Sequence, residues 1–334
     1  MAWPAASPSE TSTTETKEPV PPRYSEGKLS LVPDRSQVRK WSLGAISPAE
    51  AVLVRCVPAA EHATMASAPS WWQAAAVAEA AARAGGAAAL AHFRRPGLNV
   101  DTKADDSPVT RADRESEAAI RACIAAAFPE DDWLGEETGA TASGRTSGRR
   151  WIVDPVDGTR NFIRGIPLWS VLIACEEFTP TDTRIVASAV GFPALDEWYS
   201  AVRGGGARCG QTPVQVSAIA RLADSGMAYY TRSWFTKAGL GALFDELESA
   251  TAIQRGGGDA YGHALVASGR MECIVEPGLQ VWDAAATSLL VEEAGGRWSD
   301  LSGKADLRAG TLVLSNGLVH DQVLAIAARH RSRS

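Results

Sequence analysis

Two aspartates lie three residues apart at the end of a short apolar run. The segment Trp151–Asp154 predicts a buried strand that ends in an aspartate, and Asp157 follows a turn that begins at Pro155. Their carboxylates can therefore converge, while Gly158-Thr159 would open a helix whose free N–H groups and positive dipole end hold an anion. Cation ligands beside an anion site are what phosphoryl transfer requires. Taken by itself, however, the segment is explained better by a surface turn.

Further acids elsewhere in the chain could join this pair. Glu136 and Glu137 follow an apolar pair, whereas Asp113 and Asp283 stand at the starts of expected helices. Each has an ordinary explanation, because paired glutamates are usually solvated and a first-turn aspartate stabilises its helix by about 1 kcal/mol. If the acids do converge, electrostatics decides what else is needed. Two carboxylates about 4 Å apart repel by roughly 4 kcal/mol at an effective dielectric constant near 20, so a divalent cation becomes close to obligatory.

The joint order of these segments resembles the inositol monophosphatase family. The resemblance rests on Gly135–Glu137, Trp151–Thr159, Trp282–Ala286 and Glu293–Gly296, and it runs from about residue 70 to the C-terminus. It also takes in Lys103, Ser107–Thr110, Asp113, Asn161-Phe162 and Ser315–Gly317. It implies an α+β fold: a layered α-β-α-β-α sandwich of the inositol monophosphatase and fructose bisphosphatase type, usually found as a homodimer.

The resemblance also implies a metal-dependent phosphatase with Mg²⁺ as its cofactor, in two or three ions per site. One ion would be held by Glu136, Asp154 and the Val156 carbonyl, and a second by Asp154, Asp157 and Asp283. A ligand set of oxygens without histidine or cysteine suits Mg²⁺ better than Zn²⁺.

The remaining motif residues would act on the water and the phosphate. The resemblance implies that Asp113, Thr159 and Glu136 position and deprotonate the attacking water. The N–H groups of Gly158 and Thr159 would hold phosphate oxygens. Lys103 would lie on a loop that closes over the site, and Glu137 would act through its neighbours.

The choice of phosphate ester depends on the segment Arg255–Gly262. It resembles the branch of the family that dephosphorylates histidinol phosphate, and Glu276 lies seven residues before Asp283, where the family places a substrate-contacting acid. Histidinol carries an ammonium group, which Glu276 and Asp259 would suit electrostatically. Two alternatives remain: an inositol-1-phosphate phosphatase, and a non-catalytic family member. An ion pair of Asp259 with Arg255 across the glycine turn explains that aspartate equally well.

Composition excludes several other classes of protein. The chain has 334 residues and a net charge of −6, which argues against a nucleic-acid-binding surface. Five scattered cysteines without a C-x-x-C pair indicate reduced thiols and a cytoplasmic location. No apolar run approaches the roughly 20 residues that a bilayer requires. The glycine runs at 204–206 and 256–258 do not complete a dinucleotide-binding motif. The expected partner is a small-molecule phosphate ester.

The chain divides into an extension and a phosphatase-like domain. Residues 1–68 are rich in proline, serine and threonine and predict disorder, whereas residues 69–332 carry every motif. Strands in runs between helices, without strict alternation, favour layers of sheets and helices. Expected helices are Trp71–Phe93, weakened at Gly85-Gly86, and Asp113–Phe128, Trp282–Ala294 and Leu318–His330; expected strands are Trp151–Asp154, Val171–Cys175, Arg184–Gly191 and Glu197–Val202.

Overall fold

A computed structural model describes residues 71–95, 100–102, 108–141 and 143–331. The predicted disordered extension, residues 1–68, lies outside these residues, as does Lys103. Among the helices described, none is both long enough and apolar enough to cross a membrane.

Two sheets form the framework of the described part of the chain. In the larger, the strand order is β10-β9-β8-β7-β6-β5-β3-β4, and in the smaller it is β12-β11-β13-β15-β14. The larger sheet contains β10 Thr212–Pro213, β9 Gly206–Cys209, β8 Glu197–Val202, β7 Thr183–Phe192, β6 Ser170–Phe178, β5 Gly148–Asp157, β3 Asp132–Gly135 and β4 Gly139–Thr141. The smaller contains β12 Ile253–Gly256, β11 Gly226–Tyr229, β13 Cys273–Pro277, β15 Thr311–Ser315 and β14 Arg297–Ser299; β1 Val100–Thr102 pairs with β2 Pro108–Thr110.

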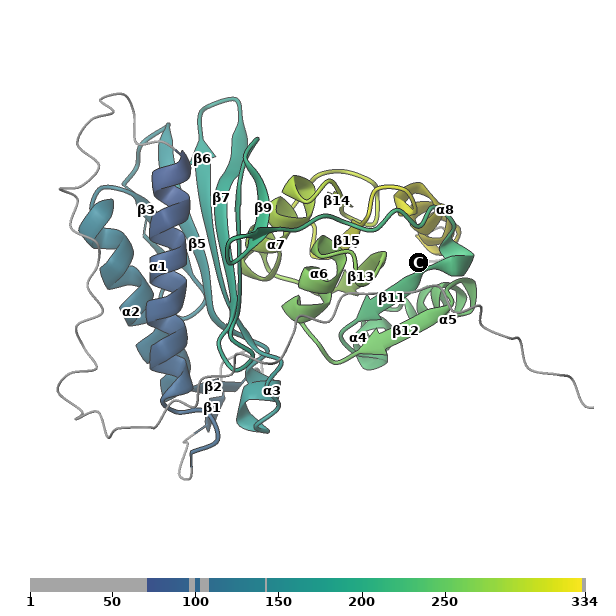
Figure 1. Ribbon diagram of the computed structural model, residues 1–334, viewed down its shortest axis with the longest axis horizontal. Helices are drawn as coiled ribbons and strands as arrows, with labels where there is room; N and C mark the ends of the chain where they lie inside the picture. The colour runs from purple at the N-terminus through teal and green to yellow at the C-terminus, as the bar shows by residue number, and fades with distance from the viewer. Residues whose placement is uncertain (1–70, 96–99, 103–107, 142, 332–334) are drawn as a thin grey trace, which may run out of the picture. The chain divides into compact units, whose positions relative to one another are not determined.

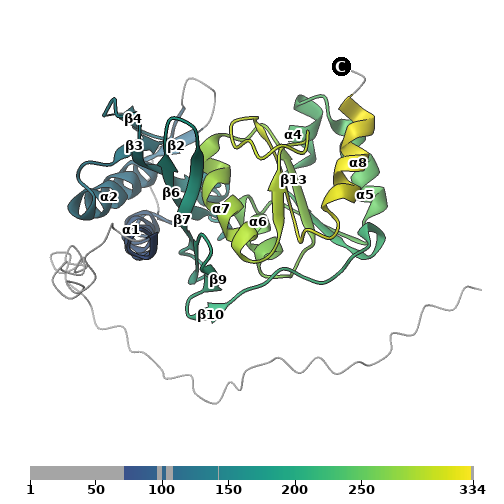
Figure 2. The same ribbon diagram turned by 90° about the horizontal axis from the view of Figure 1, so that it is seen from above.

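Helices cover the sheets in alternate layers, as Figures 1 and 2 show. Helices α1 (Trp71–Leu90) and α2 (Arg111–Ala127) lie on one face of the larger sheet, and α6 (Ala260–Ala267) and α7 (Val281–Glu293) lie between the two sheets. Helices α5 (Gly241–Ala250) and α8 (His320–Arg331) pack on the outer face of the smaller sheet. The short helices are α3 (Thr159–Ile163) and α4 (Arg232–Lys237). The expected α-β-α-β-α sandwich is confirmed.

Alternation along the strands builds the layers. Trp151 and Val153 join the apolar cluster under α1 and α2, whereas Ile152, between them, joins the cluster under α7. Because β5 is covered on both faces, its apolar run is continuous, as expected of a buried strand. In the smaller sheet, Val313 faces α5 and α8, while Leu312 and Leu314 face α6 and α7.

Helix α1 differs from the expectation at its glycines. It continues through Gly85-Gly86 without a break, because both residues are buried contact points where the helix approaches its neighbours closely. A Cβ on Gly85 would lie 2.5 Å from Cγ1 of Ile120 on α2, and one on Gly86 would lie 2.7 Å from Cγ of Pro193. The glycines therefore permit close packing of the helix and do not weaken it.

The other expected elements are found with adjusted bounds. The strand Glu197–Val202 has the expected limits, and the remaining strands and helices differ by a few residues at their ends. Strand β5 is the informative exception. It does not end at Asp154 but continues through Pro155 to Asp157, with a bulge between the two aspartates. Proline is tolerated there because a bulge leaves a residue outside the hydrogen-bond ladder.

The contact between α1 and α2 gives a stability prediction. Gly85→Ala should lower the thermal midpoint by about 3–6 °C, since overpacking costs about 1–3 kcal/mol and outweighs the gain of up to about 1 kcal/mol in helix propensity. Differential scanning calorimetry measures the change. Ala87→Ser, at an exposed position of the same helix, is the matched control and should leave the midpoint within about 1 °C. A higher midpoint for Gly85→Ala would show that the helices have room for a methyl group.

Candidate active site

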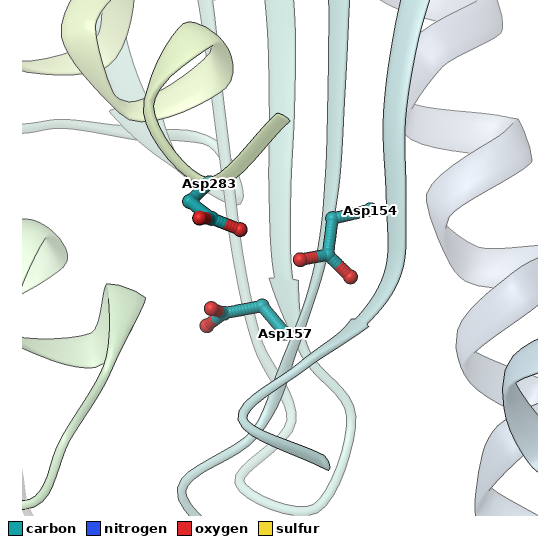
Figure 3. A group of neighbouring side chains, drawn as sticks. All are labelled: Asp154, Asp157 and Asp283. Atoms are coloured by element: carbon teal, nitrogen blue, oxygen red, sulfur yellow. The ribbon is translucent and has the colours of Figure 1, made fainter. Parts of the chain in front are cut away.

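Three aspartates converge where β5 ends and α7 begins. Asp154, Asp157 and Asp283 each offer a carboxylate oxygen, and these oxygens all lie within 4.8 Å of one another. Figure 3 shows the three side chains directed toward a common centre, two from the strand and one from the helix. Asp154 is buried and the other two are half-buried. The convergence that the sequence predicted is therefore present.

The bulge in β5 explains how two aspartates three residues apart can face the same centre. In a regular strand, residues i and i+3 point to opposite faces of the sheet. Asp154 pairs with Leu172 and Asp157 pairs with Ser170, so β5 spans three residues where β6 spans two. The extra residue returns Asp157 to the side of Asp154.

Hydrogen bonds fix the carboxylates within the cluster. Asp157 Oδ2 accepts from the Ser170 hydroxyl at 2.7 Å and from the Ala260 N–H at 3.1 Å, and Asp154 Oδ1 accepts from the Val156 N–H at 3.0 Å. Both bonds to Asp157 engage Oδ2. Its Oδ1 therefore remains for an ion without loss of the anchoring bonds.

Asp113 and Asp283 each cap a helix and also reach toward the site. Asp283 Oδ2 accepts from the Gln280 N–H at 2.7 Å, and Asp113 Oδ2 accepts from the Thr110 N–H at 2.8 Å. Asp113 Oδ1 also accepts from the Thr159 hydroxyl at 3.3 Å. The capping explanation is confirmed for these two aspartates, and it does not exclude a role in the site, because a carboxylate has two oxygens.

Glu136 lies beside Asp154 because β3 and β5 are parallel neighbours whose carboxyl ends meet at one edge of the sheet. The Glu136 N–H donates to the Val153 carbonyl at 3.1 Å, and the Glu136 carboxyl is hydrogen-bonded to Asp154. The next residue, Glu137, is held by its backbone: its N–H donates to Glu117 of α2 at 2.8 Å. Glu117 is buried, so this bond ties the loop after β3 to the helix.

The acidic groups strongly perturb one another. Burial raises the pKa of Asp154 well above its usual value, and Glu136, Asp157 and Asp283 raise it further. Burial raises the pKa of Asp157 to about 6. The pKa of Asp283 is also raised well above its usual value, by burial and then by Asp157. The metal-free cluster therefore binds protons more readily than free carboxylates do, and a bound cation would compete with those protons.

The expected phosphate-binding turn has special backbone geometry. Gly158 adopts a left-handed conformation (φ 80°, ψ 35°), and a Cβ there would lie 2.9 Å from Oδ2 of Asp259. Helix α3, which starts at Thr159, is a single short turn, so any anion would be held by the N–H groups and little by a helix dipole. The Val156 carbonyl accepts from the Thr159 hydroxyl at 3.0 Å and retains a second lone pair.

The two expected substrate acids, Glu276, which is buried, and Asp259, which is half-buried, line the same pocket as the aspartate cluster. Asp259 does not pair with Arg255, whose guanidinium donates to the Gln254 carbonyl. Instead, Oδ2 of Asp259 accepts from the Asn161 amide at 2.8 Å. Burial raises the pKa of Asp259 to about 9, with further contributions from nearby acids. Asp259 also has φ 43° and ψ −134°, a strained conformation for a residue with a side chain. The alternative of an Asp259–Arg255 ion pair is therefore wrong.

Several pocket residues were not found from the sequence. Tyr230 and Trp234 form an edge-to-face aromatic pair with ring centroids 5.7 Å apart on the pocket wall. Arg160 brings a guanidinium to the rim, and His263 lies buried behind Glu276. Arg160 lies between the motif residues Thr159 and Asn161, but no role was predicted for Arg160 itself. Tyr230, Trp234 and His263 carry no local signal, because they meet the acids only after the chain folds.

Comparison with known proteins agrees with this fold. The model of the inositol monophosphatase family matches residues 71–333. The chain is 42% identical to a histidinol-phosphatase of Chlorobaculum parvum over 246 residues, covering 73% of this chain and 93% of that protein. It is 39% identical to an inositol-1-monophosphatase of Mesorhizobium japonicum, covering 68% of this chain and 85% of that protein. Its structure is similar to the extragenic suppressor protein suhB of Bartonella henselae, with a TM-score of 0.69, 31% identity and coverage of 75% and 97%.

The layered fold and the carboxylate cluster define a phosphatase class. Within it, the chain belongs to the inositol monophosphatase family.

The raised pKa values predict how stability depends on pH. Asp157 and Asp259 bind more protons in the folded metal-free protein than in the unfolded chain between pH about 4 and 9, because the pKa of Asp157 is about 6 and that of Asp259 about 9. Stability then falls as pH rises through this window. The thermal midpoint of the metal-free protein should therefore decrease from pH 5 to pH 9, and saturating Mg²⁺ should flatten the decrease.

Two variants sharpen this measurement. Asp283→Asn removes one interacting acid, so it should reduce both the pH slope and the gain from Mg²⁺. Asp245→Asn removes an acid from an exposed ion pair with Arg232 and should leave both unchanged. A metal-free midpoint that rises steadily from pH 5 to pH 9 would contradict the assignment of the cluster.

Proposed function

We propose that this phosphoric monoester hydrolase acts on L-histidinol phosphate, releasing L-histidinol and phosphate, with Mg²⁺ held by the carboxylate cluster. The observation that carries the proposal is a pair of acids, the half-buried Asp259 and the buried Glu276, beside an aromatic wall in the pocket that contains the cluster. The similarity to a histidinol-phosphatase supports it. The alternative substrate is inositol 1-phosphate, supported by the inositol-1-monophosphatase relative.

The donor set fits a hard divalent cation. Asp154, Asp157 and Asp283 offer only oxygens, and the pKa values of Asp154 and Asp283 are raised first by burial and then by neighbouring acids, whose charge a cation would neutralise. Glu136 and the Val156 carbonyl would complete the ligands. We propose two or three Mg²⁺ ions per site. Bound there, Mg²⁺ supplies Lewis-acid polarisation of the phosphate ester and neutralises its charge.

The side chains that would handle the attacking water are Thr159, Asp113 and Glu136. The Thr159 hydroxyl has one proton and two acceptors within reach, Asp113 Oδ1 at 3.3 Å and the Val156 carbonyl at 3.0 Å. Its own lone pairs can accept from a water. A proton from that water can pass through the hydroxyl to Asp113. Burial raises the pKa of Asp113, which makes this carboxylate better suited to act as a general base.

The phosphate would be held by backbone donors. The N–H groups of Gly158 and Thr159 stand at the turn between the cluster and α3, and the left-handed conformation of Gly158 lets the backbone approach closely. The guanidinium of Arg160 at the pocket rim adds a positive charge that favours entry of a phosphate dianion.

The alcohol part of the substrate would lie against the acids and the aromatic wall. L-Histidinol carries an ammonium group and an imidazole ring, whereas inositol carries only hydroxyl groups. Glu276 can accept from the ammonium, and an ammonium near Asp259 would favour the anionic form of that acid by lowering its raised pKa. Tyr230 and Trp234 offer ring surfaces to the imidazole. A homodimer, a cytoplasmic location and a supporting role for Lys103, which lies outside the described residues, also remain predictions.

Steady-state kinetics on purified protein test the substrate. The value of kcat/KM should be higher for L-histidinol phosphate than for inositol 1-phosphate. Glu276→Gln should lower it for L-histidinol phosphate by about tenfold to a hundredfold, because a charge-assisted hydrogen bond contributes about 1.5–3 kcal/mol. Inositol 1-phosphate should lose less, since its hydroxyl groups are uncharged.

Glu272→Gln is the matched control, because Glu272 is a buried glutamate just before the same strand, bonded to the Gly226 N–H and absent from the pocket lining. It should leave the ratio of the two substrates unchanged. A wild-type preference for inositol 1-phosphate would refute the substrate and leave the phosphatase assignment intact.

A further inference from the structure

A buried histidine stands directly behind the substrate-facing glutamate. His263 of α6 is 1% exposed, and its Nε2 lies 2.7 Å from Oε2 of Glu276 on β13. Its Nδ1 lies 2.9 Å from the hydroxyl oxygen of Thr287 on α7. Three elements that meet only in the folded protein thus place the imidazole between two partners.

The hydrogen-bond network assigns the protons of this group. The Thr287 hydroxyl lies 3.1 Å from the Ala284 carbonyl, which can only accept, so the hydroxyl proton points there. The hydroxyl oxygen therefore accepts from His263, and Nδ1 carries a hydrogen. A single further proton lies between Nε2 of His263 and Oε2 of Glu276, whichever atom it is bonded to.

This arrangement uses one carboxylate oxygen of Glu276 and leaves the other, Oε1, available. Oε1 is buried and has no hydrogen-bond partner among the described residues, although Glu276 lines the pocket that holds the aspartate cluster. Because the only shared proton is on the Oε2 side, Oε1 can accept a hydrogen bond and cannot donate one. A buried carboxylate oxygen in this state is available to accept a hydrogen bond from a group bound in the pocket.

We infer that His263 is a positioning residue for substrate selection: it holds Oε2 of Glu276 so that Oε1 faces the pocket as an acceptor for the ammonium group of the substrate. The inference rests on the proposed function, since it assumes that the alcohol carries a cationic donor. It adds a role for a pocket-lining residue that acts through Glu276.

The cost of losing His263 follows from burial. Without His263, Oε2 of Glu276 loses the partner that holds it in place, and a buried carboxylate without a partner is destabilised. The carboxylate would then be free to turn, and Oε1 would no longer be held where the substrate needs an acceptor. Substrates with an ammonium group would lose affinity, whereas those without one would not.

The test compares L-histidinol phosphate with its desamino analogue, 3-(imidazol-4-yl)propyl phosphate. The wild type should favour L-histidinol phosphate through a lower KM. His263→Leu removes the hydrogen-bond donor at similar volume and should raise the KM of L-histidinol phosphate about tenfold or more. Its kcat should stay within about threefold of the wild-type value, and the KM of the analogue should change by no more than about twofold. His263→Gln should restore part of the discrimination, because its amide can donate to Glu276.

Controls separate positioning from simple stability. His320 is also fully buried and is held between the Ser299 and Ser315 hydroxyls, outside the pocket lining. His320→Gln should lower the thermal midpoint without changing the ratio of the two substrates. If His263→Leu does not fold, Thr287→Val frees the Nδ1 side of the ring and should raise the KM of L-histidinol phosphate several-fold.

Each outcome assigns success or failure to one claim. If the wild type discriminates and His263→Leu, or Thr287→Val in its place, keeps the full discrimination, the role of His263 is refuted while the substrate stands. If His263→Leu impairs both substrates equally, the residue is structural and the inference is wrong. If the wild type does not distinguish the two phosphates, Glu276 does not recognise the ammonium group, and both the proposed substrate and the role of His263 are refuted.

Discussion

Electrostatic repulsion among carboxylates is the constraint on which the rest of the site depends. Asp154, Asp157 and Asp283 present oxygens within 4.8 Å of one another, and Glu136 adds a fourth acid beside them. Such a group is unfavourable unless protons or a cation neutralise it. The protein nevertheless holds these side chains in place through the bulge in β5, the cap of α7 and the bonds from Ser170 and Ala260. The fold therefore supplies the geometry and leaves the charge for a metal to balance.

Side chains on one face of helix α2 contact the loops around the aspartate cluster. Asp113, Ser116 and Glu117 lie at i, i+3 and i+4, so their side chains project together. They contact in turn the Thr159 hydroxyl, the Pro155 carbonyl at 3.0 Å and the loop after β3. All three are buried. The close approach of α1 at Gly85 packs against Ser116 on this same helix, so helix packing and site geometry are linked.

The sequence identified the acids that the structure brings together, but it did not predict how they are brought together. The acids could be found because each lies in a motif, and the layered fold followed from the same motifs and the runs of strands. The bulge between Asp154 and Asp157 could not be found, since the segment predicts a turn as readily as a bulged strand. His263 and Trp234 were missed because their partners lie on other elements of the fold. The glycines of α1 were misjudged because propensity describes an isolated helix and not its neighbours.

Anomalous X-ray diffraction from crystals soaked in Mn²⁺ is the measurement that tests the central claim most directly. Mn²⁺ accepts the same oxygen ligands as Mg²⁺ and can be located by its own scattering. The account predicts anomalous density among the carboxylates of Asp154, Asp157 and Asp283. Clear Mn²⁺ density elsewhere, with these three side chains unchanged and without an ion between them, would contradict it.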